Sequence, residues 1–174
     1  MKKFLGLTLL AVAMLGISTA SAQKMARINF QEVVVAMPEF EQAQKNLETF
    51  RRDLVDQMEQ IMVEFNTKLQ DFEKNQATMA QSVKQMKQQE LQQLQQRYTE
   101  FQQVAEQDMQ KKYSELMEPV HKKAQEAISK IAKANNYIVV FETGSLVYFD
   151  ESQLVDIAPL VKKELGIVEK PATK

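Results

Sequence analysis

Few residues in this chain could carry out chemistry. The 174 residues include one histidine, His121, and no cysteine, so the usual zinc ligands and nucleophile–base pairs are missing. No glycine-rich phosphate loop precedes a helix. Acidic and basic residues recur at helical spacing, as in Glu64 and Lys68, which favours ion pairs on solvated helix faces over catalytic carboxylates. We therefore expect no enzymatic activity, no cofactor and no metal site, and we interpret His121 as a solvated helix residue.

The methionines are better suited to binding than to catalysis. Methionine is flexible and polarizable, and it recurs on surfaces that accept many apolar partners. We expect Met58 and Met109 to fill a seam between helices. For Met79, Val83 and Met86 we favour contact with an apolar partner, because they fall where a helical hairpin would end and would have no facing core.

These residues lie in one stretch, Pro38 to Asn135, that must be mostly helical. It has no glycine and one internal proline, Pro119, and it is rich in strong helix formers. Apolar residues recur first in steps of three and four with a mean of about 3.67 residues per turn, a nearly straight seam. These are Leu47, Phe50, Leu54, Met58, Ile61, Phe65, Leu69 and Phe72. A second series follows helical spacing: Leu91, Leu94, Tyr98, Phe101, Ala105, Met109, Tyr113, Leu116 and Val120.

Weak helix formers between the two series, from Asn75 to Ser82, favour two arms folded back on each other over residues 38–135. The tip is expected between Asn75 and Gln89, and each arm should be about 60 Å long. One unbroken rod is the alternative, since no glycine or proline forces a turn. Pro119 should kink or break the second arm, because proline removes a backbone hydrogen bond.

The N-terminus predicts export. Lys2 and Lys3, an apolar run and Ala20-Ser21-Ala22 form the pattern of a cleaved signal peptide over residues 1–22, and an uncleaved anchor is the alternative. The full chain has 22 Lys and Arg against 23 Asp and Glu, so removal of Lys2 and Lys3 leaves 20 against 23 and a net charge of −3. An acidic mature protein argues against nucleic acid as a partner.

The remaining segments predict a small β body built from residues 23–37 and 136–166. Met25 to Ile28 is strand-like, and Asn29 to Glu32 matches a capping box. Tyr137 to Phe141 and Leu146 to Phe149 are rich in β-branched and aromatic residues around a turn, which predicts a β-hairpin. Asp156 should cap a last helix that Gly166 ends, followed by a tail at 167–174. Because so small a body cannot bury its apolar surface, we expect self-association.

Four features occur together in this chain: the signal peptide, a short strand before Asn29-Phe30-Gln31-Glu32-Val33, the Gln/Lys/Glu-rich hairpin, and the segment from Asn136 to Phe149. In this combination the chain resembles the Skp/OmpH family of periplasmic chaperones for outer-membrane proteins. The resemblance implies a mainly α fold with a small β trimerisation body, from which helical hairpins hang like tentacles around a cavity. It also implies a homotrimer that holds unfolded outer-membrane proteins, its clients, without ATP. Well-known family members are strongly basic, whereas this mature chain is acidic overall. Contact with lipopolysaccharide or the membrane surface, which the resemblance implies, is therefore less expected here.

Two groups of residues are expected to carry this function. Client binding at the tip and arms is assigned to Met79, Val83, Met86, Lys84, Lys87, Phe65 and Phe72. Oligomerisation is assigned to Ile28, Val33, Tyr137, Val139, Phe141, Val147 and Phe149. The alternative function is a structural coiled-coil spacer or adaptor of the cell envelope that binds one folded partner.

Overall fold

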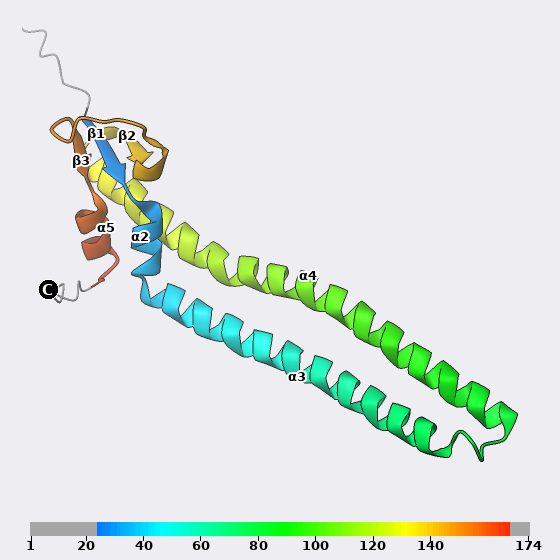
Figure 1. The fold of residues 1–174 in the computed structure, drawn as a ribbon. Coiled ribbons are helices and arrows are strands. Elements are labelled where there is room, and N and C mark those ends of the chain that lie inside the picture. Colours follow the sequence, from blue (N-terminus) through cyan, green and yellow to red (C-terminus); the bar gives the residue numbers. More distant parts are fainter. Residues whose placement is uncertain (1–23, 168–174) are drawn as a thin grey trace, which may run out of the picture.

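A computed structural model describes residues 24–167 as a small α/β body with one long helical hairpin extending from it (Figure 1). The elements are β1 (Lys24–Ile28), α2 (Phe30–Val35), α3 (Pro38–Asn75), α4 (Gln81–Ala134), β2 (Tyr137–Glu142), a 3-10 turn (Thr143–Ser145), β3 (Leu154–Asp156) and α5 (Ala158–Glu164). This confirms the mainly α fold with a small β body. The predicted signal peptide at 1–22 and residues 168–174 of the predicted tail lie outside the described residues.

The hairpin consists of α3 and α4, which lie side by side and are joined by residues 76–80 (Figure 1). The chain therefore folds back on itself and is not one rod. Pro38 occupies the first turn of α3, where its missing amide costs nothing. The 38 residues of α3 span about 57 Å at 1.5 Å per residue. None of the helices within residues 24–167 is long and apolar enough to cross a membrane.

Apolar residues at the predicted spacing form the seam between the arms. Ile61 on α3 and Leu94 on α4 are buried, and most other members of the two series are half-buried. Tyr113 is the exception, with 43% of its surface exposed. The period was readable from sequence because residues three and four apart share one helix face.

Pro119 does not break α4, which continues to Ala134. Pro119 and Glu115, whose carbonyl loses its usual amide partner, are both exposed. Water can therefore satisfy that carbonyl, and packing of the neighbouring Met117 and Val120 into the body holds the helix together.

The sheet differs from the predicted hairpin. Its three strands are all parallel in the order β2-β1-β3, so the chain crosses from one side of β1 to the other after β2. Leu146 to Phe149 forms no strand, and Leu154–Asp156 takes the third position instead. Leu154 is buried there whereas Val147 is fully exposed, so composition alone misidentified the pairing segment.

Hydrogen bonds from backbone amides to side chains begin the short helices α2 and α5 of the body. Asn29 Oδ1 accepts a hydrogen bond from Glu32 N at 3.0 Å, as the sequence predicts. The Glu32 carboxylate accepts from Lys162 Nζ of α5 at 2.6 Å, so it ties two helices together. Ile157, and not the predicted Asp156, occupies the N-cap position of α5, although Asp156 Oδ1 accepts a hydrogen bond from Ala158 N at 2.9 Å. Gly166 follows that helix with a φ of 71°, which favours glycine.

Two apolar clusters hold the body to the base of the arms. The first joins the sheet to α4 and α5 through Ala26, Ile28, Val33, Ala127, Ile157, Ala158 and Val161. The second joins α2 to both arms through Val34, Met37, Ala43, Met117, Val120 and Ala124. Helix α2 contributes Val33 to one cluster and Val34 to the other, so it links sheet and arms.

An ion pair between Glu39 and Lys123 closes the base of the two arms. The hydrogen bond from Lys123 lowers the pKa of Glu39 below its ordinary value of 4.5. A pKa that is lower in the folded state contributes stability above about pH 4.5, which is lost as pH falls through the folded pKa. Glu39→Gln should therefore flatten the acid limb of the stability curve, by less than about 1 kcal/mol because both side chains are partly exposed.

Urea midpoints at neutral pH and at about pH 3 check this prediction, because the midpoint reports the free energy of unfolding. The matched control is Glu126→Gln, an exposed glutamate on α4 for which the described structure shows no ion pair. Equal acid sensitivity of the wild type and the Glu39 variant would contradict it.

Candidate functional site

The tip of the hairpin presents apolar side chains to solvent. Met79 lies in the turn and is half-buried, while Val83 and Met86 in the first turns of α4 are 37% and 54% exposed. The hairpin ends at residues 76–80 (Figure 1), so the two arms have no further turns beyond these residues. Val83 and Met86 are therefore accessible to a partner, and Met79 is partly so.

The tip lysines differ in availability. Lys74 is exposed in the last turn of α3, and Lys84 is half-buried near the start of α4. Within the described residues, neither has an ion-pair partner. Lys87 Nζ lies 3.9 Å from Asp71 Oδ2 and 3.7 Å from Glu90 Oε2, so its charge is already compensated inside the hairpin.

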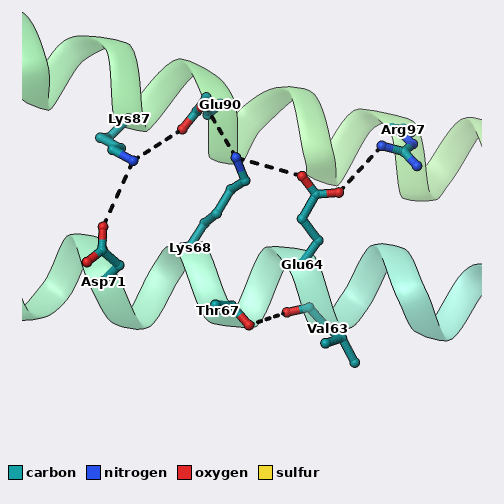
Figure 2. Close-up of polar contacts among 8 residues, drawn as sticks. All are labelled: Val63, Glu64, Thr67, Lys68, Asp71, Lys87, Glu90 and Arg97. Atoms are coloured by element: carbon teal, nitrogen blue, oxygen red, sulfur yellow. Dashed lines mark hydrogen bonds and ion pairs between the residues drawn. The ribbon is translucent and has the colours of Figure 1, made fainter.

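Lys87 belongs to a network of charges between the arms, which Figure 2 shows. The inter-arm charge network contains three carboxylates and three cations: Glu64, Lys68, Asp71, Lys87, Glu90 and Arg97. Lys68 Nζ lies 3.4 Å from Glu90 Oε1 and 3.7 Å from Glu64 Oε1. Arg97 Nη1 lies 3.6 Å from Glu64 Oε2.

Three contacts of this network cross from α3 to α4: Lys68 to Glu90, Asp71 to Lys87 and Glu64 to Arg97. Its formal charges sum to zero, so it offers no net attraction to a charged client. Exposed ion pairs contribute little each, and they count toward stability mainly where several charges form a network, as they do here.

The two aromatic residues assigned to client binding lie in the seam. Phe65 and Phe72 are half-buried on the face of α3 that meets α4. A client could reach the covered part of these rings only where the arms separate.

The residues assigned to oligomerisation fall into three groups. Ile28 and Val33 are buried within the chain, at 3% and 0% exposure, and Tyr137 packs against the same cluster. Val139 and Phe141 are half-buried and lie beside Met25 and Arg27 of β1.

Val147 and Phe149 form the third group, in the loop between β2 and β3. Val147 is fully exposed, while Phe149 is half-buried with the Arg27 guanidinium 4.9 Å from its ring centroid. Ile138 and Tyr148, which the sequence analysis did not single out for a role, are 60% and 84% exposed. Their signal was the same β-branched and aromatic composition that predicted the strands.

His121 is not a freely solvated residue. It is half-buried, and its ring centroid lies 5.6 Å from that of Phe30 with the planes tilted by 58°. Proximity to α2 across the base of the arms, which the sequence did not reveal, accounts for this difference. Among residues 24–167, no group of three or more His, Cys, Asp or Glu side chains is placed to hold a metal ion.

Comparisons with known proteins agree with this architecture. The chaperone protein Skp of Yersinia enterocolitica is 24% identical over 165 residues, covering 95% of this chain and 99% of that protein. The chaperone protein Skp of Vibrio cholerae is 26% identical over 144 residues, covering 83% and 85%. The crystal structure of an OmpH-like protein from Caulobacter crescentus superposes with a TM-score of 0.74 at 12% identity, covering 91% of this chain and 93% of that one.

The family match includes both the body and the arms. Residues 24–165 match the sequence model of the family described as outer membrane protein (OmpH-like). The match runs from the start of β1 to the residue after α5. Because this match spans most of the sequence, the chain belongs to the OmpH-like family.

Proposed function

We propose that this protein is an ATP-independent holdase that encloses unfolded outer-membrane proteins in the periplasm and prevents their aggregation. The observation that carries the proposal is a long hairpin, mounted on a small body, whose tip and arms expose scattered apolar side chains. These are Val55, Met62, Val63, Val83, Met86 and Val104. The relatives named chaperone protein Skp support it, and the predicted signal peptide supports a periplasmic location.

The holdase works as a homotrimer. Within residues 24–167, no further strand pairs with the outer edges of the sheet, on β2 and β3. Beside them, Ile138, Val147 and Tyr148 expose apolar surface that a monomer leaves in water. Pairing of bodies from several copies would cover this surface, and the family resemblance supports three copies.

Retention of a client depends on many weak contacts. Each exposed apolar residue on the arms offers a small contact area, and three hairpins around one cavity present these contacts at high effective concentration. Because the contacts are weak individually, a client can leave without hydrolysis of a nucleotide. A net charge of −3 for the mature chain disfavours anionic partners such as lipopolysaccharide.

The direct test is suppression of aggregation. An unfolded outer-membrane barrel protein is diluted from urea into buffer with and without the mature protein, and light scattering is followed. A holdase keeps scattering low at stoichiometric amounts, and added ATP changes nothing. Scattering that is the same with and without the protein would support the alternative, a structural spacer or adaptor, and would contradict the proposal.

Client retention should depend on the apolar tip and only weakly on salt. Simultaneous replacement of Met79, Val83 and Met86 by serine should weaken binding about ten-fold. This assumes that the exposed tip realises only part of the roughly 1.5–3 kcal/mol that each fully buried side chain would contribute. Salt should matter little because Lys87 is paired within the hairpin. Fluorescence titrations of a labelled unfolded barrel protein at low and moderate salt measure both effects.

The matched control replaces Gln85, Gln88 and Gln89 by serine, which changes neighbouring polar residues of the same helix. That variant should bind as the wild type does. Binding that collapses at moderate salt, with normal affinity of the Met79, Val83 and Met86 variant, would make Lys74 and Lys84 the main attraction and contradict the apolar tip.

A further inference from the structure

A groove of about 500 Å³ opens between the arms in their body-proximal half. Its floor is apolar and is shared by Leu47, Leu54 and Met58 of α3 with Ala105, Met109 and Tyr113 of α4. We attribute the groove to Ala105, because this small residue occupies a seam position where the neighbouring members of its series, Phe101 and Met109, are large. The seam therefore lacks one layer of side chains here.

The groove opens on the edge of the hairpin opposite to the inter-arm charge network. Four residues of α3 lie on one side of the seam because they follow one another at steps of four, three and four: Arg51, Val55, Met58 and Met62. The α3 members of the network, at 64, 68 and 71, lie on the other side of the seam, about 150° away around the helix axis at 100° per residue. Val55 and Met62 are 48% and 39% exposed, so apolar surface continues outside the groove. The charges therefore lie along one edge in the tip half of the hairpin, and the groove opens on the other edge in the body-proximal half.

The dimensions of the groove fit an extended polypeptide. Its lining runs from Leu47 to Met58 on one arm and from Gln102 to Tyr113 on the other. Eleven helical steps of 1.5 Å give about 16 Å, the length of about five residues of extended chain. In such a segment every second side chain points the same way, so two or three could enter the floor. Transmembrane β-strands of outer-membrane proteins alternate apolar and polar residues in this way.

The rim supplies groups that a polypeptide backbone can use. Gln102 and Gln110 carry amides that both donate and accept hydrogen bonds, and Arg51 and Glu106 place one charge of each sign at the groove. Within the described residues, neither of these charges has an ion-pair partner. An anionic lipid would meet Glu106, whereas a neutral backbone with N–H and C=O groups complements both signs.

From this complementarity we infer that the inter-arm groove binds an extended segment of the client with alternating apolar and polar residues. The inference rests on the proposed holdase function and adds a defined subsite to it. The apolar side chains of the segment enter the gap beside Ala105, and its backbone lies along the polar rim. Each hairpin then recognises the strand pattern of a barrel protein before that strand has a partner.

The test fills the space beside Ala105 with a larger side chain. Ala105→Phe occupies the missing seam layer, and the matched control Val104→Phe adds the same ring at an adjacent residue that is 51% exposed and does not line the groove. The probe is a labelled peptide of about ten residues, the length of one barrel strand, that alternates valine with threonine. Ala105→Phe should raise its Kd about ten-fold, equivalent to about 1.4 kcal/mol, and Val104→Phe should not. A peptide of the same composition with its valines in one block should bind the wild type more weakly.

Cross-linking gives a second measurement that requires no change at Ala105. A photoreactive phenylalanine analogue replaces Gln102, at the groove, or Gln103, which does not line it. An unfolded barrel protein should cross-link from position 102 and not from position 103. Equal cross-linking from both, equal affinity of both phenylalanine variants, or cross-links from position 102 to lipid vesicles or to a second copy in place of client would overturn the inference. Aggregation suppression by the wild type would leave the holdase function standing in those cases, whereas its absence would overturn both.

Discussion

Replacing Val139 by aspartate should dissociate the protein into single chains. Ala26 and Ile28 of β1 face the core, so Met25, and Val139 beside it on β2, lie on the opposite face of the sheet. Val139 is half-buried in one chain and would be covered further in a trimer. Burial of an unpaired carboxylate costs several kcal/mol, and a symmetric assembly incurs that cost at every copy. Sedimentation should show the mass falling to about one third, the ratio set by a closed three-fold assembly.

Two further variants separate loss of assembly from loss of fold. Val104→Asp places the same charge on an exposed part of α4 and should leave the mass unchanged. Val147→Asp alters a side chain that is fully exposed within one chain, so it should weaken assembly while leaving the protection of β2 against hydrogen exchange intact. An unchanged mass for both Val139→Asp and Val147→Asp would place the interface elsewhere.

The arms were predictable because their information is local. Helix propensity and the period of the apolar series depend on residues within a few positions of one another, and they placed Ile61 and Leu94 in the seam correctly. The cap at Asn29 is local as well. Folding back at residues 76–80 was the preferred alternative because weak helix formers interrupt the pattern there.

The sheet was less predictable because strand pairing is not local. Residues 146–149 have better strand composition than the three-residue β3, yet β3 pairs with β1. Two non-local contacts favour β3: Leu154 becomes buried, and the Arg27 guanidinium lies 3.1 Å from the Asp156 carboxylate. Neither contact can be read from the composition of either segment.

The same distinction applies to the candidate site. Exposure of Val83 and Met86 follows from their position near a turn, which the sequence revealed. Pairing of Lys87 with Asp71 depends on the register between two arms, which no single-helix pattern fixes. The groove at Ala105 likewise depends on which α3 residues stand opposite a small α4 residue. Features made by one helix were therefore predicted, and features made between helices were not.

The largest effect on stability is expected at Val33. This residue was assigned to the oligomer, but it is completely buried within one chain, where α2 meets the sheet and α5. Val33→Asp should unfold the body, because an unpaired buried carboxylate costs several kcal/mol and a domain has only about 5–15 kcal/mol of stability. Hydrogen exchange at β1 and β2 should become fast while part of the arm helix persists. Holdase activity should be lost because no body remains to bring the hairpins together.

Val35→Asp is the matched control, since Val35 lies two residues further along the same helix and is 52% exposed. It introduces the same charge and the same loss of β-branched volume without burying a carboxylate. Far-UV circular dichroism, exchange protection of β2 and sedimentation mass should all match the wild type for Val35→Asp and should all change for Val33→Asp. If the two variants instead behaved alike, the body would not be organised around the contact of α2 with the sheet. The hairpins would then have to be held together by contacts between arms.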